Sequence, residues 1–429
     1  MKFYKFFIFT SIALVCAFLY KSIFGYWADS EVWAVTLSKQ KFFSFEGTEL
    51  IPSDSIGLYF KPLHHILIKF TYVAFPQSWN ILIINRIFGF LIGIGIAAVY
   101  ARIFSEILNN KRGWVLGFVA ILTVTLFFER GYRIRADLLA SLFHGLILFE
   151  FFRMQKQKDP WEIRISTAIL VLYELAFVLS TVKYLPVLFL LNILYFFLLI
   201  GSSKELYWVR FYKNKFLIQF VLIFVGVVFI HINRPLFFAQ YIGELITYSL
   251  EAVTSSPADQ NIQYIHILRW ITGNPILWAS YIGMVLFTVF RLLAPQGSST
   301  VEQKNRSLLT LYSLLLMIFI LNAPEKHAYF VASCSPLFTI LSLSYLVSIS
   351  NNLAKQYKWK ISGFQTVGLL LICKFLVLLI IYKDQWTNQD QRAYQASLKQ
   401  YLVENNISLY YDPIGILPRH MLFYAFLGP

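Results

Sequence analysis

Residues 6–24 read FFIFTSIALVCAFLYKSIF and run directly into residues 25–33, GYWADSEVW. An apolar helix of this length reaches across the hydrocarbon core of a bilayer. Tyrosine and tryptophan favour the headgroup layer, so we expect Asp29 and Glu31 at the depth of a lipid phosphate. Charge close to hydrocarbon is costly and often serves function, and we therefore interpret this acidic pair first as a candidate for chemistry. The alternative is a pair of solvated loop acids.

The rest of the chain has the composition of a polytopic membrane protein. Its 429 residues are 58% hydrophobic, 18% aromatic and 14% charged, and the mean hydropathy is +0.62. The apolar runs are about 16 to 24 residues long, whereas the strands of an outer-membrane barrel have roughly ten. This length predicts an all-α polytopic membrane protein with 11 transmembrane helices. The predicted spans are residues 6–24, 79–104, 114–128, 136–152, 166–181, 185–200, 216–232, 273–290, 308–322, 329–350 and 363–382.

The net charge of +15 follows mainly from topology. With the N-terminus inside, the inner connections hold 18 Lys and Arg in 71 residues, and the outer connections hold 15 over more than twice that length. An excess of basic residues on one side is typical of cytoplasmic loops. We therefore predict a cytoplasmic N-terminus, a plasma (inner) membrane location if the source is bacterial, and no nucleic-acid partner. The inner connections are residues 1–5, 105–113, 153–165, 201–215, 291–307 and 351–362.

The cysteines indicate neither a disulfide framework nor a zinc site. Cys16, Cys334 and Cys373 all lie in apolar spans, without CxxC or metal-type spacing. The first segment lacks a clear cleavage site, so we expect an uncleaved first span.

The connections between the predicted spans are unequal in length. The inner ones are short, whereas the outer segments 25–78, 233–272 and 383–429 are long. We predict a transmembrane domain over residues 1–382 and a small outer-face segment over residues 383–429. A transporter would show two matching halves with broken helices, and no such repeat is evident. The long outer segments favour a function at the outer face. Residues 59–70, within the first outer segment, are apolar and basic enough for a helix lying in the interface.

A second polar cluster opens the fourth predicted span with the sequence RGYRIRADLL, residues 130–139. Arg133, Arg135 and Asp137 are spaced by two residues, so the two arginines cannot both stack with the acid on one helical stripe. The functional interpretation is that the arginines hold a phosphate while Asp137 orients one of them or a substrate hydroxyl. The alternative is that Asp137 caps the helix or complements its dipole.

A third cluster, APEKHAYF at residues 323–330, fills the turn before the tenth predicted span. Lys326 and His327 would surround an anionic leaving group together with Lys61, or they are ordinary residues at a membrane edge. The adjacent His64 and His65 invite a metal interpretation, but neighbouring histidines on a helix point in different directions and no third ligand has the right spacing.

Taken together, these clusters resemble the membrane-integral glycosyltransferases of the GT-C type, particularly the bacterial branch with the aminoarabinose and dolichyl-phosphate-mannose-dependent transferases. All of them fall on the outer side of one topology. Phe60 and the lone proline after Lys61 depart from the pattern of some relatives, which leaves the donor sugar and any metal requirement open. The matching elements are Asp29-Ser30-Glu31, Tyr59-Phe60-Lys61-Pro62, Arg135-Ala136-Asp137-Leu138-Leu139, and Lys326-His327-Ala328-Tyr329 with Pro336.

The resemblance implies a hexosyl or pentosyl transferase of the cell envelope. Such an enzyme takes a sugar from a polyprenyl- or dolichyl-phosphate carrier and passes it to a hydroxyl of a lipid, glycan or protein, with inversion. Asp29 would then be the base, and Glu31 would orient the acceptor or share a divalent metal ion. The substrate-binding residues would be Lys61, Arg133, Arg135, Asp137, Lys326, His327 and Tyr329.

Two other functions stay open from the sequence. One is a lipid or polysaccharide transporter or flippase, which would use ionisable residues deep in several spans. Its few candidates are Glu150, Glu174 and Lys374. The other is an O-antigen-ligase-like enzyme that uses a diphosphate carrier at the same outer face.

Overall fold

A computed structural model gives the architecture of most of the predicted membrane domain. It describes residues 2–24, 61–74, 78–133, 135–157, 159–181, 184–199, 215, 217–222, 224, 228, 267–268, 270–293, 301–322, 328–358, 361–381 and 404. In this part of the chain every regular element is helical. The helices are α1 (Lys2–Phe24), α4 (Pro62–Ala74), α5 (Ser78–Ile107), α6 (Gly113–Leu122), α7 (Thr125–Arg130), α8 (Ala136–Lys156), α9 (Pro160–Ser180), α10 (Leu185–Leu199), α14 (Pro275–Leu293), α15 (Val301–Asn322), α16 (Ala328–Gln356) and α17 (Gly363–Ile381).

The chain is an integral membrane protein. Five of the described helices contain stretches long and apolar enough to cross a bilayer: Tyr4–Ile23, Ile83–Ile107, Trp161–Ser180, Val331–Gln356 and Gly363–Ile380. Each predicted span except 216–232 coincides in position with one or two helices, because a long apolar run is a strong local signal. The predicted total of 11 spans stays a prediction, since the stretch 216–232 is described only in part.

The predicted third span, residues 114–128, is wrong as a single helix. It is divided into α6 and α7 at Thr123 and Val124, where Val124 has an extended backbone with φ −68° and ψ 121°. The Thr123 hydroxyl donates to the Ala120 carbonyl, and the Thr125 hydroxyl donates over 3.2 Å to the Gly273 carbonyl. Threonine hydroxyls that bond to backbone in this way compete with a regular helix. The break therefore has a cause both in the local sequence and in a contact with a distant segment.

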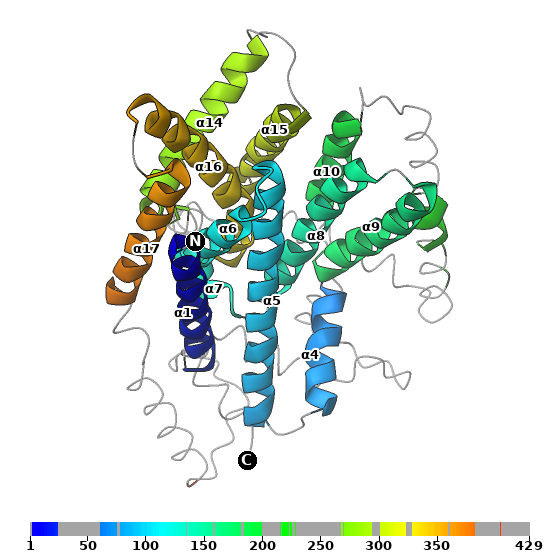
Figure 1. Cartoon of the computed structure of the whole chain (residues 1–429). Helices are drawn as coiled ribbons and strands as arrows, with labels where there is room; N and C mark the ends of the chain where they lie inside the picture. The colour runs from blue at the N-terminus through cyan, green and yellow to red at the C-terminus, as the bar shows by residue number, and fades with distance from the viewer. Residues whose placement is uncertain are drawn as a thin grey trace.

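Helix α5 lies at the centre of the bundle, beside α1, α4, α6, α8 and α16 (Figure 1). It runs antiparallel to α1, because Arg86 near its start donates to the Ser22 carbonyl at the end of α1. It runs in the same direction as α8, because Tyr100 meets His144 over 2.7 Å and Glu106 meets Lys156 at the ends of the two helices.

These contacts define two ends of the bundle, named here after the residues of α5 that mark them. The Arg86 end holds the end of α1, the start of α5 and the turn before α8, and the Glu106 end holds the ends of α5 and α8. Twenty residues of helix separate Arg86 from Glu106, which is about 30 Å at 1.5 Å per residue. That separation matches the hydrocarbon thickness of a bilayer, so the two ends lie near opposite membrane surfaces.

The predicted interfacial helix over residues 59–70 is helical from Pro62 onward, but its orientation differs from the prediction. Helix α4 begins at Pro62, where proline is well tolerated. The Thr71 hydroxyl lies 2.9 Å from Asn85, and Ile68, one turn earlier, packs on Phe88 and Ile92 of α5. The two helices thus run side by side in opposite directions, as Figure 1 shows. The prediction of a helix lying flat in the interface is wrong, because apolar residues of α4 pack on α5.

Candidate functional site

A cluster of cationic side chains lies at the Arg86 end. Lys21 is contributed by α1, Arg86 by α5, and Arg130 and Arg133 by the end of α7 and the turn that follows it. Lys21, Arg86 and Arg133 are all buried, and Arg86 is only 1% exposed. The charges of Glu129, Arg130 and Arg133 all act on Lys21, so one acid and several bases share this site. Several basic residues close together at one end of the bundle suit an anion.

Aromatic rings hold these cations in place. The Arg86 and Arg133 guanidinium groups lie 5.5 and 5.7 Å from the centre of the Tyr132 ring, and the Lys21 ammonium lies 5.0 Å from that of Phe128. Phe18 of α1 packs against Phe128 and Tyr132 beneath them, at 6.0 and 5.8 Å. Cations over ring faces retain a favourable interaction after they leave water. The rings therefore let positive charge persist in a site that excludes most solvent.

Close backbone contact brings the turn before α8 onto α5. A Cβ atom at Gly93 would lie 2.3 Å from the Gly131 carbonyl oxygen and 3.0 Å from Phe18. The turn is closed by hydrogen bonds from the Gly131 and Arg133 amides to the Phe127 and Arg130 carbonyls, at 2.7 and 3.1 Å. The glycine on α5 thus allows the turn to come close enough for Tyr132 to contact Arg86.

Arg135 and Asp137 begin α8, although not in the capping arrangement considered from sequence. Arg135 occupies the position before the helix, with an extended backbone, and Asp137 lies in the first turn. Asp137 is therefore not the N-cap residue. Its buried carboxyl group lies where a negative charge complements the helix dipole. Its charge also acts on Tyr184, which places the two groups near each other.

The first turns of α8 and α16 are joined by a buried polar network. Ser141 of α8 donates to the Ser333 carbonyl of α16 over 2.5 Å, and the Tyr184 hydroxyl lies 2.6 Å from Ser333 Oγ. His144, one turn further along α8, lies 2.7 Å from Tyr100 and 2.7 Å from Tyr312. These contacts hold Asp137 and the start of α16 in one region of the bundle.

The structure describes only part of the predicted set of site residues. Asp29, Glu31, Lys326 and His327 lie outside the described residues, and Tyr329 lies in the first turn of α16, where the backbone alone is described. Their predicted roles remain predictions.

Lys61 lies just before α4 and is half-buried. It precedes Thr71, the residue that contacts Asn85, by ten residues or about 15 Å of helix.

In the described part of the chain no group of three or more His, Cys, Asp or Glu residues could hold a metal ion.

Sequence reasoning missed Lys21 and Arg86. Both are basic residues inside apolar runs, and such residues usually face protein or a polar cavity. That exception to an apolar pattern was the available signal. The signal is weak beside that of the loops, because most polar residues are grouped there.

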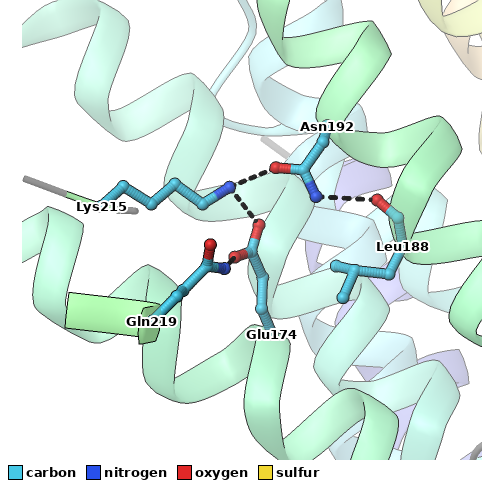
Figure 2. Close-up of polar contacts among 5 residues, drawn as sticks. All are labelled: Glu174, Leu188, Asn192, Lys215 and Gln219. Atoms are coloured by element: carbon cyan, nitrogen blue, oxygen red, sulfur yellow. Dashed lines mark hydrogen bonds and ion pairs between the residues drawn. The ribbon is translucent and has the colours of Figure 1, made fainter. Parts of the chain in front are cut away.

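The ionisable residues that would have served a transporter have local partners. Glu174 accepts from Lys215 and from Gln219, each over 2.6 Å, while Lys215 also donates to Asn192 (Figure 2). Asn192 in turn donates to the Leu188 carbonyl over 2.9 Å. The charged groups of Glu174 and Lys215 and the side-chain amide of Asn192 therefore all have partners in this network. This arrangement suits a structural connection between helices.

Lys215 itself differs from the prediction. The sequence predicts it in the inner connection 201–215, but its side chain is 0% exposed and ion-paired inside the bundle. Glu150 likewise lies 3.5 Å from Arg153, and Lys374 donates to Asn274.

Comparisons with known proteins identify the type of fold. No family model matches the chain, and no curated protein matches it. A crystal structure of the Archaeoglobus fulgidus oligosaccharyltransferase, tethered to an acceptor peptide with the NVT sequon, matches with a TM-score of 0.52 and 13% identity. The match covers 95% of this chain and 59% of that one. The chain has a GT-C fold. At this identity the likeness shows the fold alone, and the chain spans about 59% of the length of the oligosaccharyltransferase chain.

Proposed function

We propose that this protein is a membrane glycosyltransferase that moves a sugar from a polyprenyl- or dolichyl-phosphate carrier to a hydroxyl group of a lipid, glycan or protein. The observation that carries the proposal is the buried cationic cluster of Lys21, Arg86 and Arg133 at one end of a GT-C fold. Such a cluster suits the phosphate of a lipid-linked donor, because charges in a water-poor site act more strongly than exposed ones. The similar fold of an oligosaccharyltransferase supports this class of reaction.

The proposed chemistry is a direct displacement with inversion. Asp29 takes the proton of the acceptor hydroxyl, the oxygen forms a bond to the anomeric carbon, and the bond from that carbon to the phosphate oxygen breaks. The electron pair of the broken bond stays on the phosphate, which leaves with the carrier lipid. A well-placed base of this kind contributes about 10²- to 10⁴-fold in rate. Glu31 would orient the acceptor, alone or through a divalent ion.

The proposed phosphate site combines predicted and newly found residues. Lys61, Arg135 and Lys326 would contact the phosphate, and Arg133 and Arg86 would add positive charge from the buried side. Asp137, which the network around Ser333 holds near the start of α16, would orient Arg135 or a sugar hydroxyl together with His327 and Tyr329. The site would face the outer side of the plasma membrane.

The donor sugar is a finer part of this proposal. The motifs resemble those of the aminoarabinose- and mannose-dependent transferases, so these two sugars are the first donors to test. The departures at Phe60 and after Lys61 leave the choice between them to experiment.

The deciding experiment measures donor turnover by the purified protein in nanodiscs. Polyprenyl-phosphate donors carrying aminoarabinose, mannose or glucose are supplied, and release of polyprenyl phosphate and labelled acceptor is followed by mass spectrometry. We expect turnover of one donor by the native chain and loss of turnover in Asp29→Asn, with unchanged insertion and thermal unfolding. A comparison of lipids and surface glycans between cells with and without the gene identifies the acceptor. Identical lipid and glycan profiles, with no donor turned over, would overturn the proposal.

A further inference from the structure

A groove of about 600 Å³ lies at the Glu106 end, between the ends of α5 and α8 and the start of α9. It is far from the proposed site, because about 30 Å of α5 separates Glu106 from Arg86. Phe149 and Phe152 give the groove an apolar wall. The remaining walls carry side chains of both charges, so the groove is suited to a ligand with both an apolar and a charged part.

The cations of the groove keep their charged groups accessible. Arg102 and Arg153 have about half of their side-chain area exposed, and Lys156 has 66%. Arg153 lies 3.5 Å from the buried Glu150, whereas Arg102 and Lys156 form surface ion pairs with Glu106. Exposed pairs of this kind contribute little and exchange readily for another anion.

Two further anions of the groove, besides Glu106, lie at the start of α9. Asp159 precedes the helix and accepts the Trp161 amide over 2.9 Å, and Glu162 lies in the first turn. Glu162 is exposed, and Asp159 has a second carboxylate oxygen beyond the one that accepts the amide. This part of the groove can therefore receive hydrogen bonds from a cationic ligand group.

Two exposed tryptophans place this end of the bundle at the membrane surface. Trp161 begins α9 beside the groove, and Trp114 begins α6 at the same end; both rings are exposed although the helices behind them are apolar. Tryptophan in such positions is typical of the headgroup layer. The groove thus lies at headgroup depth in the leaflet opposite the proposed site.

We propose that this groove binds the headgroup of a glycerophospholipid that carries both a phosphate and a primary ammonium group, as phosphatidylethanolamine does. Arg102 and Arg153 bind the phosphate, since guanidinium groups match its geometry. Asp159 and Glu162 accept hydrogen bonds from the ammonium, and Phe149 contacts the glycerol and the first acyl carbons. An anionic headgroup would meet the carboxylates unfavourably, and a phosphocholine has no N–H to donate.

Native mass spectrometry of the full chain tests this proposal. The protein is exchanged into detergent with dioleoyl phosphatidylethanolamine, dioleoyl phosphatidylcholine or dioleoyl phosphatidylglycerol, and retained lipid is counted at matched concentrations. We expect at least tenfold stronger retention of phosphatidylethanolamine. Glu162→Gln should reduce that preference to near equality with phosphatidylcholine, and Arg153→Gln should weaken both. Lys355→Gln, an exposed cation at the end of α16, is the matched control and should change nothing.

The possible results separate clearly. Equal retention of all three lipids, or a preference that survives Glu162→Gln, would overturn the proposal and indicate a non-specific lipid shell. Preferential retention of phosphatidylglycerol would overturn it in favour of an anionic-lipid site. Arg102→Gln serves as a second variant if Arg153→Gln fails to insert, because it removes a phosphate contact without touching Glu150. Donor turnover plays no part in these readouts.

Discussion

The two ends of α5 carry similar side chains in opposite surroundings. At the Arg86 end, arginine and lysine are buried among Phe18, Phe128 and Tyr132. At the Glu106 end, Arg102 is 50% exposed and shares the surface with carboxylates. The free-energy cost of an arginine side chain on α5 therefore differs between the two ends. A buried cation is expensive unless an anion or an aromatic face compensates it, whereas an exposed one is cheap and exchangeable.

This difference points to different roles for the two ends. The buried cluster is held in fixed geometry by rings and by the turn at Gly131, which favours recognition of one particular anion. The side chains of the exposed groove can adjust to a ligand. This favours a lipid headgroup that exchanges with the surrounding lipids. If burial, and not charge alone, governs what each residue contributes, substitutions of buried and exposed charges should differ in their effects.

The largest effect is expected where charge is buried in a pair. Replacing Glu174 by Gln leaves Lys215 without its ionic partner and should lower the free energy of unfolding by about 3 to 5 kcal/mol. The double variant Glu174→Leu with Lys215→Met removes both charges and should recover most of that loss. Thermal unfolding in detergent measures both. A double variant as unstable as the single one would show that the network is more than a compensated charge pair.

A somewhat smaller effect is expected on catalysis at the Arg86 end. Under the proposed function, Arg86→Gln should weaken transition-state stabilisation by about 2 to 4 kcal/mol, seen as a loss in kcat/KM for donor turnover. Arg102→Gln, the same change on the same helix at the opposite end, should leave turnover within twofold. Arg86→Lys keeps the charge and should recover part of the activity. Equal losses from Arg86→Gln and Arg102→Gln would remove the distinction between the two ends.

The packing of the turn on α5 supplies the next test. Gly93→Ala would force its Cβ against the Gly131 carbonyl and should destabilise the protein by about 1 to 3 kcal/mol. Gly95→Ala is the matched change, two residues along, and meets only the end of the Leu142 side chain at 3.3 Å. Thermal unfolding should separate the two variants clearly. A tolerated Gly93→Ala would mean that the turn lies further from α5.

The smallest effect is expected at the exposed ion pair. Lys156→Gln breaks its contact with Glu106, but the lysine is 66% exposed, so the free energy of unfolding should change by less than about 1 kcal/mol. Raising the salt concentration should change the free energy of unfolding of the native protein equally little, because solvent already screens this pair. A loss as large as that of Glu174→Gln would contradict the comparison.

Much of the helical framework was predictable because its signal is local. A long apolar run in a membrane must form a helix, since its backbone groups have no other hydrogen-bond partners there. The predicted spans near α1, α5, α16 and α17 accordingly coincide with helices. The helix after Pro62 was also predicted, but its position against α5 was not, because that depends on which partner its apolar face meets.

The sequence by itself determined that this is a helical membrane protein with polar clusters between its spans, since length and hydrophobicity are properties of single segments. Only the tertiary structure decided which charges are buried. Lys21, Arg86 and Lys215 look alike in sequence as basic residues in or beside apolar runs. All three lie over aromatic rings, but Lys215 also forms a buried ion pair with Glu174. The reason is physical: the cost of a charge depends on the atoms around it, and those atoms come from helices distant in the chain.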